Sequence, residues 1–128
     1  MIQQITKGIK ISVQSNFEGT FFKDQILYYA FSYDITIENN SQKTVQLQTR
    51  KWYILDALNT IEIVEGEGVI GQQPIIAPSE RYSYRSGCHL RSPFGAMNGI
   101  YNMLCLSDNS SFEVVIPNFR LHSQFAQN

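Results

Sequence analysis

The chain has 128 residues, a length that suits one domain and is short for two. Ten Lys plus Arg and eleven Asp plus Glu give a formal net charge of −1, which excludes the basic surplus typical of nucleic-acid-binding proteins. Charged residues make up 16% and apolar residues 43% of the chain, a balance that excludes intrinsic disorder. We therefore expect a single domain over residues 1–128, with no nucleic-acid partner.

The first residues, MIQQITKGIKISVQS, lack the continuous apolar stretch and the small-residue cleavage site of a signal peptide. No later segment approaches the roughly 20 consecutive apolar residues that a membrane-spanning helix needs. We therefore expect a cytoplasmic protein that has no membrane partner.

The first half of the chain alternates apolar and polar residues with a period of two. This pattern begins at residues 9–13 and is longest at residues 27–37, where the odd positions are apolar or aromatic. Only an extended strand places two such sets on opposite faces. The second run ends at Asn39-Asn40-Ser41, whose side chains favour turns. These segments are predicted to be strands.

The next strand, at residues 45–54, changes phase part of the way along. Its apolar residues occupy odd positions at Val45 and Leu47 and even positions at Trp52 and Ile54. A change of phase inside a strand is typical of a β-bulge, which inserts one residue into the ladder. We place this bulge at Thr49–Lys51.

Shorter alternating segments follow at residues 61–63, 82–84 and 112–116. We expect the last of them to stop at Pro117, which has no N–H to donate to a ladder. Residues 97–106 are apolar at both odd and even positions, which predicts a central strand covered on both faces.

No segment carries a helical apolar stripe of three turns, and about 120 residues hold seven or eight predicted strands. This pattern predicts an all-β fold, an antiparallel β-sandwich of seven to eight strands. The order Ile76-x-Pro78-x-x-x-Tyr82 is that of a tyrosine corner, which favours a fibronectin type III or immunoglobulin-like variety. The immunoglobulin disulfide is absent, because both cysteines follow Trp52.

The sequence shows neither a metal centre nor a catalytic constellation. Cys88 and Cys105 are too few for a disulfide framework, and we expect both to be reduced packing residues. His89 and His122 are the only histidines, and neither C-x-x-C nor H-x-x-x-H spacing occurs. We therefore predict no metal site, no cofactor and no catalytic residue.

The segment Gly66-Glu67-Gly68-Val69-Ile70-Gly71, here called the glycine loop, matches G-x-G-x-x-G. In dinucleotide-binding folds that motif leads from a strand into a helix whose N-terminus holds a pyrophosphate. Pro74 and Pro78 prevent such a helix here. We interpret the segment as a surface loop that binds a ligand or a partner, with an anion-binding nest as the alternative. Its candidate binding residues are Gly66, Gly68, Gly71, Gln72 and Gln73.

A second candidate recognition site is the patch Arg50, Lys51 and Trp52. Arg and Trp are typical anchors for acidic or phosphorylated partners. The alternative interpretation is the solvated side of a strand. Trp52 contributes to recognition only if its side chain is accessible; otherwise it is a core residue of the sandwich.

Six segments in fixed order resemble the bacterial ApaG family over nearly the whole chain. Two departures are Ser79, where a Gly is common, and Lys51, where a His is frequent. The matching segments are YAFSYDITIENNS (29–41), VQLQTRKWYILDA (45–57), VEGEGVIGQQPIIAPSE (64–80), YRSGCHL (84–90), SPFGAMNGIY (92–101) and FEVVIPNFRL (112–121).

The resemblance implies a fibronectin type III or immunoglobulin-like sandwich and an association with cobalt resistance and magnesium efflux. It also implies a role in protein interaction, because similar domains occur in eukaryotic F-box proteins and in a polymerase delta-interacting protein. We expect a non-catalytic binding or adaptor module with an unidentified protein partner, and a homodimer is compatible with this expectation. The alternative is a protein that binds nucleoside polyphosphate or pyrophosphate with magnesium through the glycine loop.

Overall fold

A computed structural model describes residues 1–58 and 60–123. These residues form strands and turns and contain no helix, so no helix that could span a membrane is present among them. The prediction of an all-β fold is confirmed. The strands are β1 (Ile2–Thr6), β2 (Ile9–Lys23), β3 (Ile26–Asn39), β4 (Val45–Asp56), β5 (Thr60–Glu67), β6 (Ile75–Ile76), β7 (Arg81–Leu90), β8 (Phe94–Cys105) and β9 (Ser110–His122).

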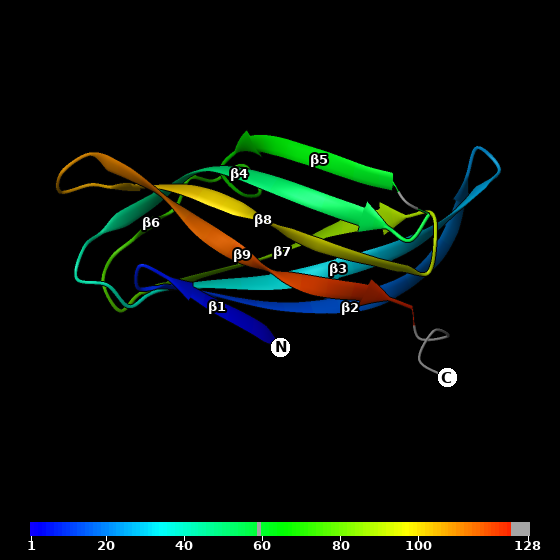
Figure 1. Ribbon diagram of the computed structural model, residues 1–128, viewed down its shortest axis with the longest axis horizontal. Helices are drawn as coiled ribbons and strands as arrows, with labels where there is room; N and C mark the ends of the chain where they lie inside the picture. The colour runs from blue at the N-terminus through cyan, green and yellow to red at the C-terminus, as the bar shows by residue number, and fades with distance from the viewer. Residues whose placement is uncertain (59, 124–128) are drawn as a thin grey trace.

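The strands form two antiparallel sheets that pack as a sandwich (Figure 1). One sheet has the order β1-β2-β3-β7, and the other has the order β5-β4-β8-β9, with the short β6 paired to β4. The sheets meet along one side, where Ser15 Oγ of β2 donates to the carbonyl of Arg120 in β9. On the opposite side of the sandwich, β7 is the edge strand of the first sheet and β5 is the edge strand of the second.

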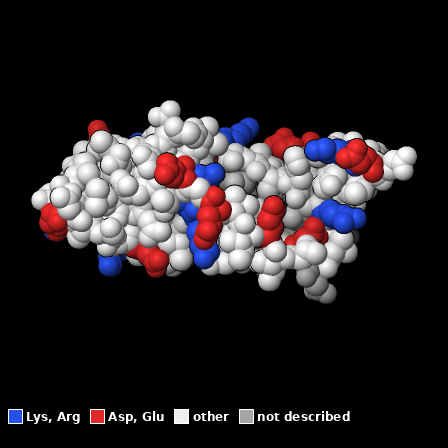
Figure 2. All heavy atoms as spheres, turned by 90° about the horizontal axis from the view of Figure 1, so that it is seen from above, with Lys and Arg blue, Asp and Glu red and all other residues white. Residues whose placement is uncertain are grey.

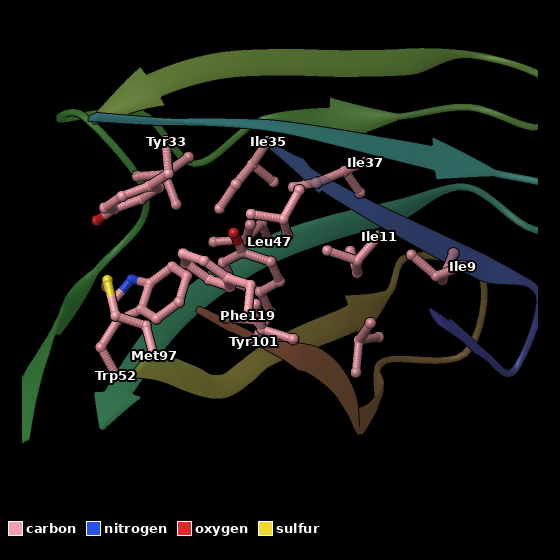
Figure 3. Close-up of a cluster of buried hydrophobic side chains, with 14 of the residues drawn as sticks. Ile9, Ile11, Tyr33, Ile35, Ile37, Leu47, Trp52, Met97, Tyr101 and Phe119 are labelled. Carbon is pink, nitrogen blue, oxygen red and sulfur yellow. The ribbon is translucent and has the colours of Figure 1, made fainter. Parts of the chain in front are cut away.

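The core lies between the two sheets and is built by the alternation seen in the sequence. The odd-numbered apolar residues are buried from Ile9 to Val13 in β2 and from Phe31 to Ile37 in β3. Aromatic side chains fill one end of the core, where Tyr33 and Phe119 pack around Trp52 (Figure 3). Because one strand face is buried, a slip of one residue would turn the whole apolar set outward.

The bulge in β4 is confirmed, but it lies earlier than predicted. Leu47 pairs with Met103 and Thr49 pairs with Asn102, so Gln48 is the inserted residue. Residues 49–51 therefore lie after the bulge, where the even-numbered side chains face the core. The large apolar side chains do not reveal the insertion site, because Thr49 to Lys51 carry none of them.

The prediction that Pro117 ends the last strand is wrong, because β9 continues to His122. Gly99 pairs with Ile116 and Met97 with Phe119, so two residues of β9 oppose the single Asn98 of β8. Pro117 is one of these two residues. A bulge tolerates proline because the ladder needs no N–H there.

The described residues form nine strands, which roughly matches the seven or eight predicted; β1 and the two-residue β6 were missed. Two further expectations require correction. Strand β8 is central, between β4 and β9, but it is covered on one face only, since buried and more exposed residues alternate along it.

The predicted tyrosine corner does not form, because among the described residues the Tyr82 hydroxyl has no hydrogen-bond partner. The side chain of the buried Asn39 instead links two segments here, because its Nδ2 donates to the carbonyls of Lys43 and Ile76.

Candidate functional site

A cleft of about 280 Å³ opens between the sheets on the side where β5 and β7 end them. It is lined by residues of β3, β4, β5, β7 and β8 and by the glycine loop. Arg50, Trp52 and Gly71, which the sequence placed in two separate candidate sites, all line this one cleft. The structure therefore brings part of each predicted site to one cleft, while Lys51, Gly66, Gly68, Gln72 and Gln73 do not line it.

Trp52 is not an exposed recognition anchor, so its place in the predicted patch is corrected. Its side chain is 3% exposed, and its ring packs against Tyr33 with 5.3 Å between centroids and edge-on against Phe119 at 6.0 Å. Trp52 is a core residue with one edge in the cleft.

Arg50 and Lys51 do not form one patch either, because neighbouring residues of a strand point to opposite faces. Arg50 lines the cleft between the sheets. Lys51 lies on the outer face of β4, where its Nζ is 3.3 Å from a carboxylate oxygen of Glu65 and 5.4 Å from the ring centre of Tyr53. Figure 2, seen from the β5 side, shows basic side chains in separate places, interleaved with acidic and uncharged ones.

Arg50 holds the glycine loop in place. Its Nη1 donates to the backbone carbonyls of Glu67 and Gly68, each at 2.9 Å. The guanidinium lies directly over Gly66, where a β-carbon would be 2.9 Å from Nη1. Among the described residues, no carboxylate lies within 4 Å of this guanidinium. The loop therefore presents carbonyl oxygens to the arginine.

Most of the amides an anion-binding nest would need already have acceptors. The Gly68 N–H donates to the carbonyl of Gln48, and Val69 and Gln72 donate to each other's carbonyls. The Gln73 side chain is also committed, because its Nε2 donates to the Gln48 carbonyl at 3.0 Å. The geometry therefore favours a structural role for these loop amides over phosphate binding.

Sequence reasoning missed the tyrosines of the cleft. Tyr33 and Tyr84 line it together with Ser86, and the Tyr84 hydroxyl is hydrogen-bonded to that of the fully buried Tyr101. Burial raises the pKa of all three tyrosines, and the nearby positive charge of Arg50 opposes this rise in each case. The alternation at residues 82–84 was the available signal, because it already placed tyrosine side chains on the core face.

Both cysteines are free, as predicted. Cys105 is buried, and burial raises the pKa of the Cys88 thiol to about 12, so this thiol stays protonated and unreactive. Over residues 1–58 and 60–123, no three His, Cys, Asp or Glu side chains gather in a group that could hold a metal ion.

The fold and site define a class: a small antiparallel β-sandwich, closed on one side and open on the other, with a loop-covered cleft at its open side. The family profile of the ApaG domain matches residues 21–105. A protein named ApaG from Methylobacterium nodulans is 42% identical over 94% of this chain and 92% of its own length. Another protein named ApaG, from Bradyrhizobium diazoefficiens, is 41% identical over 96% of this chain and 94% of its own length.

Solved structures agree with this sequence match. The crystal structure of a protein described as ApaA from Bordetella pertussis has a TM-score of 0.80 and 33% identity, covering 91% of this chain and 94% of that one. The chain belongs to the ApaG family.

One departure from the usual family pattern has a structural consequence. Ser79 adopts a left-handed backbone conformation, with φ of 71°. Glycine occupies such a position without a steric penalty, so a glycine would fit this turn better than the serine does. In this chain the serine adopts it in the turn where Glu80 N–H donates to the Ala77 carbonyl.

Proposed function

We propose that this protein is a non-catalytic binding module that works in the cytoplasm and docks a protein partner along the free edge of β5. The observation that carries the proposal is the edge itself. Strand β5 pairs with β4 on one side only, contains no bulge, and is eight residues long. A long unprotected edge of this kind is a template for an added strand.

The free backbone groups of this edge can be assigned. The Gly68 N–H donates to the Gln48 carbonyl, which fixes the hydrogen-bonding phase of the β4–β5 ladder. In an antiparallel pair the bonding residues alternate. The N–H and C=O groups of Ile61, Ile63 and Glu65 therefore point away from β4, toward the place of an incoming strand.

The side chains of the edge add an apolar contact surface. Ile61 is 66% exposed and Ile63 is 56% exposed, and both lie on the outer face of the sheet. Their partners in β4 are Leu55, which is 39% exposed, and Tyr53. An exposed apolar group next to free ladder positions supports docking by strand addition.

The charge of β5 indicates which kind of strand can pair with its free edge. Strand β5 contains Glu62, Glu65 and Glu67 and no basic residue. Two copies paired through this edge would bring six carboxylates together, so the homodimer that the sequence left open is not favoured at this surface. We commit to a partner with an extended segment that alternates apolar and basic residues, so that basic side chains meet the glutamates.

Selection of peptides from a random display library tests this function. The selected peptides should alternate Lys or Arg with apolar residues. Ile63→Pro should abolish their binding, because it removes an outward N–H without breaking a bond to β4. The matched control Ile63→Thr keeps the N–H and should bind within a few-fold of the wild type. Peptides that bind Ile63→Pro as tightly as the wild type would refute docking at β5.

Several finer parts of the proposal rest on family resemblance. One of them is the link to cobalt and magnesium homeostasis, which we propose the bound partner provides, without an ion bound by this chain. The strand orders β2-β3-β7 and β5-β4-β8-β9 support a fibronectin type III-like variety of the sandwich. The nucleoside polyphosphate alternative is the weaker proposal, because the loop amides of Gly68, Val69 and Gln72 already donate to carbonyls.

A further inference from the structure

The cleft beside the glycine loop contains hydrogen-bond donors that have no protein acceptor. Trp52 lines the cleft and is 3% exposed, yet its indole N–H has no acceptor among the described residues. Among the described residues, the only fully buried side-chain polar atom without a partner is Ser123 Oγ, so the indole N–H of Trp52 reaches the open cleft, where water or a ligand can accept its hydrogen bond. Figure 3 shows the indole nitrogen of Trp52 and the hydroxyl of Tyr33 at the same end of the buried cluster.

Arg50 supplies a second set of free donors to the same cleft. Its Nη1 is occupied by the Glu67 and Gly68 carbonyls, which fixes the plane of the guanidinium over Gly66. Its Nε and Nη2 have no hydrogen-bond acceptor among the described residues. An arginine held rigidly by other contacts loses little entropy when it binds an anion.

One part of the cleft wall is apolar, although the lining as a whole is mixed and also includes Glu67 and Tyr84. Ile54 and Val64 line it from the β4–β5 side, and Met97 lines it from β8. A site with fixed donors at one end and an apolar wall suits a ligand that has one anionic group and a short apolar body. The volume of about 280 Å³ limits that body to roughly the size of one aromatic ring or a short alkyl chain.

We propose that this cleft binds the carboxylate group of a small amphiphilic ligand. The guanidinium of Arg50 would bind the carboxylate through Nε and Nη2, the geometry in which arginine recognises carboxylates. The indole N–H of Trp52 and one hydroxyl of the hydrogen-bonded pair Tyr33 and Ser86 would complete its hydrogen bonds. This site is separate from the β5 edge and does not depend on docking there.

A carboxylate fits this cleft better than a phosphate does. A phosphate dianion has no apolar body to place against Ile54, Val64 and Met97, and removing its hydration against such walls is costly. Glu62 also faces this side of β5, and its charge contributes to the raised pKa of Cys88. A nearby carboxylate opposes a dianion more strongly than a monoanion.

The test is a titration of the ¹⁵N-labelled full chain with benzoate, followed by NMR. The chain has one tryptophan, so its indole N–H gives a single resonance that reports on the cleft. Benzoate should shift this resonance saturably, and the neutral isostere benzyl alcohol should not. Inorganic phosphate should bind at least tenfold more weakly than benzoate. An indole resonance that does not move, or that moves equally with benzyl alcohol, would overturn the proposal.

Three variants connect the shift to the proposed donors. Tyr33→Phe keeps the ring and removes one hydroxyl, so benzoate should bind about 2- to 12-fold more weakly. Arg50→Lys should lose at least tenfold, because a lysine cannot bind a carboxylate in the same bidentate way. Glu62→Gln leaves the donors intact and should strengthen binding by about 1.4- to 5-fold. Unchanged affinity in both Tyr33→Phe and Glu62→Gln would contradict the site even if Arg50→Lys does not fold.

Two sources could supply the carboxylate: a free small molecule or the C-terminus of a peptide. Comparing acetyl-Gly-Phe with its C-terminal amide distinguishes them. If the free-acid peptide binds more tightly than benzoate and its amide does not bind, the ligand is a chain terminus. If benzoate binds as tightly as the peptide or more tightly, the ligand is a small molecule. If neither acid binds, there is no carboxylate site.

Discussion

The guanidinium of Arg50 lies flat on Gly66, and the pair fixes the loop that covers the cleft. A β-carbon at residue 66 would lie 2.9 Å from Nη1, and that nitrogen donates to two loop carbonyls. The glycine is therefore needed for the arginine to reach the loop, independently of any need for a special backbone angle. Gly66 therefore has a structural role, because it lets Arg50 hold the loop beside the cleft.

We expect Gly66→Ala to displace Arg50 and to lower the free energy of unfolding by about 1–3 kcal/mol, the scale of losing hydrogen bonds to a charged donor. Urea denaturation measures this loss. If the loss acts through Arg50, Gly66→Ala should cost little in an Arg50→Met background. Equal losses in both backgrounds would show that the alanine acts on the backbone alone.

Truncating the buried tryptophan should be among the most damaging single changes. Trp52→Ala removes a side chain that is 3% exposed and packs against two rings, and we expect a loss of about 3–5 kcal/mol. Lys51→Ala, on the outer face of the same strand, should lower the free energy of unfolding far less. Chemical denaturation of both variants checks the assignment, and similar costs would contradict the opposite orientation of these neighbours.

Two glycines of the loop should respond differently to alanine. Gly68 has a φ of 62°, and a β-carbon there would lie 2.1 Å from the Gln72 carbonyl oxygen. Gly71 has a φ of 72° with no atom within 4 Å of that position. Gly71→Ala should therefore cost about 1–2 kcal/mol from the backbone alone, and Gly68→Ala more. Thermal unfolding of both variants decides the order, and the reverse order would contradict the described loop.

Acid should weaken the fold partly through Asp56. Burial works to raise the pKa of this carboxyl, but hydrogen bonds from Ser92 and from the N–H groups of Arg91 and Leu58 outweigh burial and lower it. A carboxyl with a lowered pKa in the folded state stabilises the fold above its unfolded pKa of about 3.9. This contribution is lost as the pH falls through the folded value.

Asp56→Asn should lower the free energy of unfolding at pH 7 by about 1–3 kcal/mol. Its stability should also fall less than that of the wild type between pH 4 and pH 2. Urea titrations across this range provide the comparison. Parallel pH curves for the two proteins would show that Asp56 does not contribute to acid sensitivity.

The fold was predictable wherever one strand face is buried and the other is solvated. The alternation along β3 therefore predicted its position within one or two residues, and the phase change predicted a bulge in β4. The bulge at Pro117 was not predictable, because a proline signals the end of a ladder and an accommodating bulge equally well. The short β6 carries too few residues to show any period.

The candidate site was predictable only in part. The glycine loop and Arg50 were identified from residue types, but their contact depends on the pairing of β4 with β5, which brings together residues 16 positions apart. Trp52 illustrates the limit of the sequence. A tryptophan on a central strand is expected in a core and also at an interface, and only packing against Tyr33 and Phe119 resolves the choice.

The central claim is that β5 accepts a partner strand along its free edge. Amide hydrogen exchange, measured by NMR with and without a selected basic peptide, tests it most directly. The claim predicts slower exchange at the N–H groups of Ile61, Ile63 and Glu65, which are the donors that point away from β4. Unchanged exchange at these three amides, with protection on β7 or in the glycine loop instead, would contradict it.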